Sequence, residues 1–157
     1  MSVLTRLRRL FNAGAPTASV EIAADRVTGL ALGRGRGREV MAVVTETLPA
    51  GVLTPTANAT NFADRTAVSE AVSRVLKQLP GTPRRVALVV PDSAAKVSLM
   101  TFEQIPARAD DLAQLVRWQS RKTAPFRVED AQIAYSSGLP TDDGGCELVV
   151  SLMRRDI

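Results

Sequence analysis

The segment that most constrains the fold is residues 121–135, where a helical pattern, a turn and a strand pattern follow one another directly. It closes an amphipathic helical pattern, and Pro125 and Phe126 then break that pattern. The residues that follow, up to Tyr135, have the composition of a strand. Together with the strand-rich patterns of the rest of the chain, this segment predicts an α+β fold.

Composition narrows the kinds of chemistry that this chain can perform. Its 157 residues are 45% apolar and 23% charged, as in an ordinary globular protein with one domain or two small ones. Without histidine, neither a Ser-His nor a Cys-His nucleophile pair can form, nor a zinc site built on imidazole. Cys146 is the only cysteine, so an internal disulfide is excluded. A general base would have to be a carboxylate, a lysine or the single tyrosine. We predict no catalytic residues and no metal site.

The first half of the chain predicts a β-β-β-α-β unit. Three strand patterns separated by turns come first, at residues 19–23, 27–32 and 39–48. A helix is then expected over residues 64–79, capped by Asp64 and ended by the Pro-Gly-Thr-Pro run at 80–83. Residues 85–90 are nearly all apolar, which is typical of a strand in the middle of a sheet that is covered on both faces.

The second half predicts a β-α-β-β unit, which we expect to begin at residue 93. Its elements are a strand at 96–105, a helix at 109–122 and strands at 129–136 and 147–153. A further helix would be needed to cover the other part of this sheet. We therefore expect the unit to be incomplete.

The first 16 residues predict a basic amphipathic segment followed by a linker. Apolar side chains recur at helical spacing with arginines around them, which is the pattern of a helix that lies in a membrane interface: Leu4, Leu7, Arg8, Leu10 and Phe11. The alternative is a terminal tail with incidental charge. No apolar run is long enough to span a bilayer and no signal-peptide core is present. The expected location is therefore the cytoplasm, at the periphery of a membrane.

An ordered set of short motifs runs along nearly the whole chain. It comprises Leu48-Pro-Ala-Gly-Val52, Val86-Ala-Leu-Val-Val-Pro-Asp-Ser93, Pro106, Pro125-Phe126 and Tyr135. In order and spacing this set resembles the type IV pilus assembly protein PilM, a member of the actin-like ATPase superfamily. The resemblance implies an actin-like subdomain 1A over residues 17–92. It also implies a subdomain 1C of the kind found in PilM and FtsA over residues 93–157.

The chain departs from the PilM pattern at the phosphate-binding hairpin. Where the family has I-D-I-G-S-S-S-V-K, this chain has Val-Glu-Ile-Ala-Ala-Asp-Arg-Val-Thr at 20–28. A glycine there would allow close approach of a phosphate, whereas Asp25 places a negative charge there. The degenerate nucleotide-binding residues are Glu21, Ala23, Ala24, Asp25 and Arg26. We expect no enzyme activity and no cofactor, with ATP and magnesium binding only in a full-length relative.

The PilM resemblance also implies a function and a partner. It implies a cytoplasmic scaffold of type IV pilus assembly that binds the N-terminal tail of a PilN-like inner-membrane protein between the two subdomains. The predicted groove residues are Val72, Val75, Val97, Leu99, Leu115 and Trp118.

Three alternatives remain open from the sequence. The first is a nucleotide-binding fragment of an actin-like ATPase. The second is a cytoplasmic component of type II secretion related to GspL. The third is nucleic-acid binding, suggested by the net charge of +4 and by the arginines within residues 33–38. A solvated hairpin tip explains that short block better, so nucleic acid is an unlikely partner.

Overall fold

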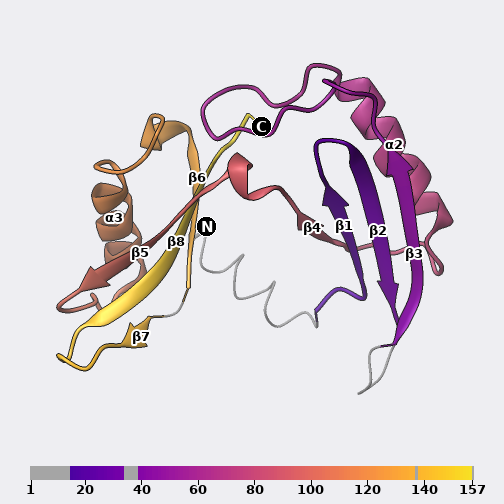
Figure 1. The fold of residues 1–157 in the computed structure, drawn as a ribbon. Coiled ribbons are helices and arrows are strands. Elements are labelled where there is room, and N and C mark those ends of the chain that lie inside the picture. Colours follow the sequence, from indigo (N-terminus) through magenta and orange to yellow (C-terminus); the bar gives the residue numbers. More distant parts are fainter. Residues whose placement is uncertain (1–14, 34–38, 137, 157) are drawn as a thin grey trace. The chain divides into compact units, whose positions relative to one another are not determined.

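The computed structural model describes residues 15–33, 39–136 and 138–156, which form two compact units (Figure 1). The N-terminal unit holds the described residues up to Pro55, together with Thr60–Pro91. The C-terminal unit holds Thr56–Ala59 and the chain from Asp92 onward. Each unit is described by itself.

The N-terminal unit is a four-stranded sheet with one helix. Its strands are β1 (Ala18–Ile22), β2 (Arg26–Leu32), β3 (Val40–Thr47) and β4 (Ala87–Val89), in the order β3-β2-β1-β4. The first three form an antiparallel meander, whereas β4 pairs parallel to β1. With helix α2 (Arg65–Gln78) between β3 and β4, the element order is the predicted β-β-β-α-β.

Helix α2 confirms both of its predicted ends. The Asp64 side chain accepts a hydrogen bond from the backbone N–H of Ala67 at 3.0 Å, and the helix stops at Gln78, just before the Pro80 turn. Its buried stripe, which includes Val75, packs in one core cluster with Val20 and Val27 of the sheet. The buried face of α2 is therefore the one on which apolar side chains recur at helical spacing.

Strand β4 differs from its prediction. The apolar run at 85–90 predicted a central strand covered on both faces. The structure instead has a three-residue strand at the edge of the sheet as described, in which Leu88 is 59% exposed and Val89 47%. The prediction was wrong because apolar composition shows that a strand suits burial, but not which neighbours it will have.

The C-terminal unit is a second antiparallel sheet with one helix. Its elements are β5 (Lys96–Phe102), α3 (Ala109–Ser120), the 3-10 turns η1 (Asp92–Ala94) and η2 (Val128–Asp130), β6 (Ala131–Tyr135), β7 (Leu139–Pro140) and β8 (Cys146–Arg154). The sheet order is β5-β8-β6, and the two-residue β7 also pairs with β8. Apart from η1, η2 and β7, which the sequence did not predict, the order is the expected β-α-β-β.

One face of this second sheet packs against α3. Met100 and Phe102 of β5 form a core cluster with Leu148 and Val150 of β8 and with Val116 of α3. Successive strand residues point to opposite faces. The intervening residues therefore form a second, open face, on which Val97, Leu99 and Val149 are exposed.

No helix within the described ranges is long and apolar enough to cross a membrane. The predicted membrane-contact residues Leu4, Leu7, Arg8, Leu10 and Phe11 lie outside the residues that the structure describes.

Candidate functional site

The β1–β2 hairpin occupies the position of the degenerate phosphate loop, and its charged groups pair with one another. The backbone N–H of Ala23 donates to the carbonyl of Arg26 at 2.8 Å and closes the turn. The Arg26 guanidinium lies 3.2 Å from the Asp25 carboxylate and 4.0 Å from that of Glu21. Two carboxylates therefore flank the cation that would have to attract a phosphate.

The rest of the hairpin offers no catalytic group. The backbone N–H of Leu48 donates to the carbonyl of Asp25 at 2.8 Å, so the end of β3 is tied to the turn, and Ala24 is exposed at the tip. Across the described ranges, no three or more His, Cys, Asp or Glu side chains lie close enough to hold a metal ion. Burial, with a smaller effect of Asp110, raises the pKa of Tyr135 above its ordinary value, which keeps the phenol neutral.

Three of the predicted groove residues contribute to the hydrophobic cores. Val75 is fully buried between α2 and the N-terminal sheet, and Val72 is partly buried against the same cluster. Leu115 packs against the core between α3 and the C-terminal sheet. A fully buried side chain such as Val75 is not accessible to a peptide, so including Val75 in the groove was a mistake.

The other three predicted groove residues are exposed, but they lie on opposite sides of the C-terminal unit. Val97 and Leu99, at 58% and 64% exposure, lie on the open face of the sheet. Trp118 is 54% exposed on α3, which covers the other face, and the Lys122 ammonium lies 4.5 Å from the centre of its ring. A single peptide that lies on one face of this unit can therefore contact either Val97 and Leu99 or Trp118, but not all three.

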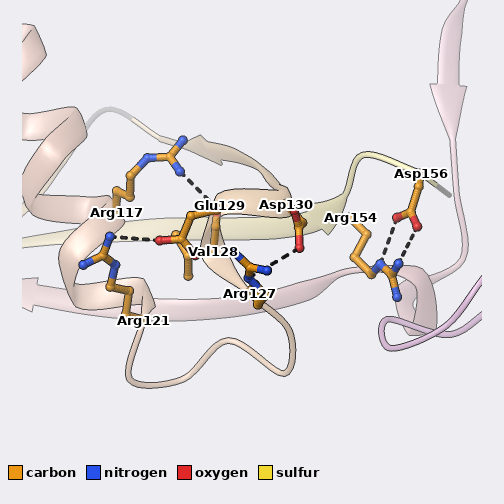
Figure 2. Close-up of polar contacts among 8 residues, drawn as sticks. All are labelled: Arg117, Arg121, Arg127, Val128, Glu129, Asp130, Arg154 and Asp156. Atoms are coloured by element: carbon orange, nitrogen blue, oxygen red, sulfur yellow. Dashed lines mark hydrogen bonds and ion pairs between the residues drawn. The ribbon is translucent and has the colours of Figure 1, made fainter.

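The segment that joins α3 to β6 carries a series of arginine contacts (Figure 2). The Arg117 guanidinium donates to the carbonyl of Val128 at 3.0 Å, and that of Arg121 donates to the Glu129 carboxylate at 2.9 Å. A backbone hydrogen bond, together with Arg121, holds the pKa of Glu129 below its usual value.

Two further arginine contacts lie close to this segment. Arg127 lies 4.0 Å from Asp130, and Arg154 pairs with Asp156 (Figure 2). Across the turn after α3, the contacts of Arg117 and Arg121 are the ones that join the helix to η2. The Pro-Phe segment is therefore a structural connection in this chain.

Sequence reasoning missed one feature, a cavity in the N-terminal unit that includes Arg84 and Arg85. The Pro-Gly-Thr-Pro run beside these arginines was interpreted only as a helix stop. The available signal in the sequence was the pair of consecutive arginines directly after a turn.

Comparison with known proteins finds a similar structure but no similar sequence. No protein-family model and no curated protein sequence matches the chain. Among solved structures, the cytoplasmic domain of EpsL, an inner-membrane component of the type II secretion system of Vibrio cholerae, matches with a TM-score of 0.52 over 90% of this chain. The chain has an EpsL-like fold.

This similarity has defined limits. The sequence identity is 14%, so the match establishes the mixed α+β fold and not the function. The chain spans about half of the EpsL domain, since it covers 48% of that chain. The EpsL-like fold does not establish the PilM family in particular.

Proposed function

We propose that this chain is a component of a type IV pilus or type II secretion assembly that acts through protein–protein contacts on the cytoplasmic side of an inner membrane. The observation that carries the proposal is the EpsL-like fold over 90% of the chain. The ordered motifs from Leu48 to Tyr135 support it independently, because they follow the PilM pattern. In this proposal the N-terminal unit corresponds to subdomain 1A and the C-terminal unit to subdomain 1C.

The proposed partner is the N-terminal tail of a PilN-like membrane protein, and its proposed contact is the open face of the C-terminal sheet. Leu99 lies directly opposite Val149 across the β5–β8 ladder, and Val97 lies two residues along the same face. All three are at least 41% exposed. Contiguous exposed apolar side chains of this kind mark interaction sites. They offer an apolar surface to the side chains of an extended or helical tail.

Leu99→Asp is expected to weaken binding of a PilN-like N-terminal peptide at least about tenfold, because burying a carboxylate in an apolar contact is costly. The side chain is mostly exposed in the free protein, so the thermal midpoint should hardly change. The measurement is peptide titration by calorimetry.

Two variants show which face is used. Val43→Asp places the same charge at a residue of similar exposure, 60%, on β3 of the N-terminal unit, and should bind normally. Trp118→Ala removes the large apolar side chain on the α3 side. If Trp118→Ala abolishes binding while Leu99→Asp does not, the open face is not the site. If no PilN-like tail binds the unmodified chain, the type II secretion alternative, which the EpsL-like fold favours, replaces the pilus one.

We also propose that the chain is not an ATPase. We expect ATP affinity no better than about millimolar and no measurable turnover, because Asp25 and Glu21 already neutralise Arg26 and Ala23 replaces a glycine at the hairpin. Calorimetry with ATP and magnesium measures this directly. A variant that combines Asp25→Ser with Ala23→Gly has the residue types of the family pattern at these two positions. It should bind ATP more tightly than the unmodified chain does. Micromolar affinity in the unmodified chain would support the ATPase alternative instead.

A further inference from the structure

A cavity of about 710 Å³ lies at the end of the N-terminal sheet opposite the β1–β2 hairpin. It is lined by the start of β1, the end of β2 and the start of β3, and by the connection from α2 to β4. Its lining residues are 15–18, 31–33, Met41 and 80–85. The volume falls in the range of small-molecule sites, roughly 300–1,000 Å³.

The cavity combines an apolar wall with two free cations. Leu32, Met41 and Pro83 supply apolar surface, whereas Arg84 and Arg85 are charged. Among the residues that the structure describes, no aspartate or glutamate lines the cavity. Neither arginine forms an ion pair or side-chain hydrogen bond with the residues that the structure describes. Most other arginines of the described ranges pair with a carboxylate of their own unit.

The lining also holds a backbone conformation that costs energy. Thr82 has a φ of 42°, directly after Gly81 at 77°, and it is the non-glycine residue with positive φ within the described ranges. A β-branched side chain rarely adopts this region, and such conformations concentrate at ligand sites. Here the conformation helps to place Pro83 and the two arginines at the cavity.

We propose that this cavity binds a small amphiphilic anion, with its apolar body against Leu32 and Met41 and its phosphate or carboxylate on Arg84 and Arg85. The site lies at the far end of the sheet from the phosphate-loop hairpin and in the other unit from the proposed peptide surface, so it is independent of the proposed function. Guanidinium groups recognise phosphate and carboxylate through paired N–H donors. Such a ligand can come from a free metabolite or from an anionic lipid, and both share this chemistry.

The first test uses dodecyl phosphate below its micelle concentration, followed in ¹⁵N–¹H spectra of the full chain. We expect saturable shifts of the Gly33, Gly81 and Thr82 amide signals, and binding at least about tenfold weaker for neutral dodecyl maltoside and for inorganic phosphate. Equal binding of the maltoside would overturn the anionic part of the proposal. Equal binding of inorganic phosphate would overturn the apolar part, and shifts that do not saturate would overturn the site.

Two kinds of variant test the assignment from different sides. Arg84→Gln and Arg85→Gln should each weaken dodecyl phosphate binding about tenfold, because each loses a charge-assisted hydrogen bond. Met41→Trp should weaken it by filling the cavity, and Met41 is 62% exposed, so the core is not disturbed. Arg155→Gln removes an exposed positive charge in the C-terminal unit and is the matched control, expected to bind normally. Unchanged binding in the two arginine variants and in Met41→Trp would refute the proposal.

Vesicles of phosphatidylglycerol distinguish the two sources of the ligand. If the Arg84→Gln/Arg85→Gln double variant co-sediments with vesicles less than the unmodified chain does, the ligand is a membrane lipid. If the two co-sediment equally while dodecyl phosphate binding is lost, the ligand is a free amphiphilic anion. Both results support the site, and they differ only in what fills it.

Discussion

Gly29→Ala is expected to destabilise the N-terminal unit by about 1–3 kcal/mol, a large loss for the addition of one methyl group. Gly29 lies in β2 under α2, and a Cβ built there would lie 2.4 Å from Cγ1 of Val75 and 3.2 Å from Cδ1 of Leu79. Val75 is fully buried and β-branched, so it cannot swing aside. The backbone at Gly29 is not in the left-handed region, so Ala itself is compatible with it.

The sign of the effect makes this a strict test. Where the added methyl group finds room, Gly→Ala stabilises by about 0.4–1 kcal/mol through the unfolded chain. Gly33→Ala is the matched control, because its Cβ would meet the Met41 sulfur at an ordinary 3.6 Å. We expect the thermal midpoint, followed by circular dichroism, to fall for Gly29→Ala by roughly 4–8 °C per kcal/mol and not to fall for Gly33→Ala.

A double variant identifies the cause. Val75→Ala removes the methyl group that a Cβ at residue 29 would meet, so adding Gly29→Ala to it should cost much less than adding Gly29→Ala to the unmodified chain. If Gly29→Ala proves as stable as the unmodified chain, the close packing of α2 on β2 is wrong.

Leu148→Ala is expected to destabilise the C-terminal unit by about 2–5 kcal/mol. Leu148 lies on β8, the central strand, is fully buried, and belongs to the core cluster that includes Phe102 and Val116. Truncation leaves a cavity, and the surrounding side chains cannot easily fill it because β8 is fixed between β5 and β6. Trp118, the single tryptophan, lies on α3 of the same unit, so urea unfolding followed by its fluorescence measures the loss.

The adjacent residue is the control for Leu148. Val149 points to the open face and is 41% exposed, so Val149→Ala should cost less than about 1 kcal/mol. Similar losses for the two variants would mean that both faces of this sheet are packed in the free protein. That result would also remove the open face as a partner surface.

The predictions that were confirmed concern features determined by interactions between residues close together in the sequence. The α2 helix follows from an apolar stripe, a cap at Asp64 and the breaker at Pro80, all of which act within a turn or two of the chain. The β1–β2 hairpin was likewise predicted as a tip of charged and small residues, and its ion pair between Arg26 and Asp25 joins adjacent residues.

The site predictions depended on something less local, namely which face of each element is covered. In β5 both alternating sets of residues include large apolar side chains, Val97 and Leu99 on one face and Met100 and Phe102 on the other. Periodicity alone therefore could not identify the face that packs against α3. Val75 was placed in a peptide groove through the PilM resemblance, although an apolar helix stripe of this kind first of all forms the core.

The sequence by itself determined the α+β class, the order of the strands and helices and the ends of α2, because backbone preferences, caps and turns act over a few residues. Only the tertiary structure decided that β4 is an edge strand in the described sheet, that Gly29 lies against Val75, and that Arg84 and Arg85 meet at a cavity. Each of these depends on residues distant in the chain that become neighbours only when the sheet pairs and the helix packs. Which of these contacts form depends on the total free energy of packing, and no short stretch of sequence contains that information.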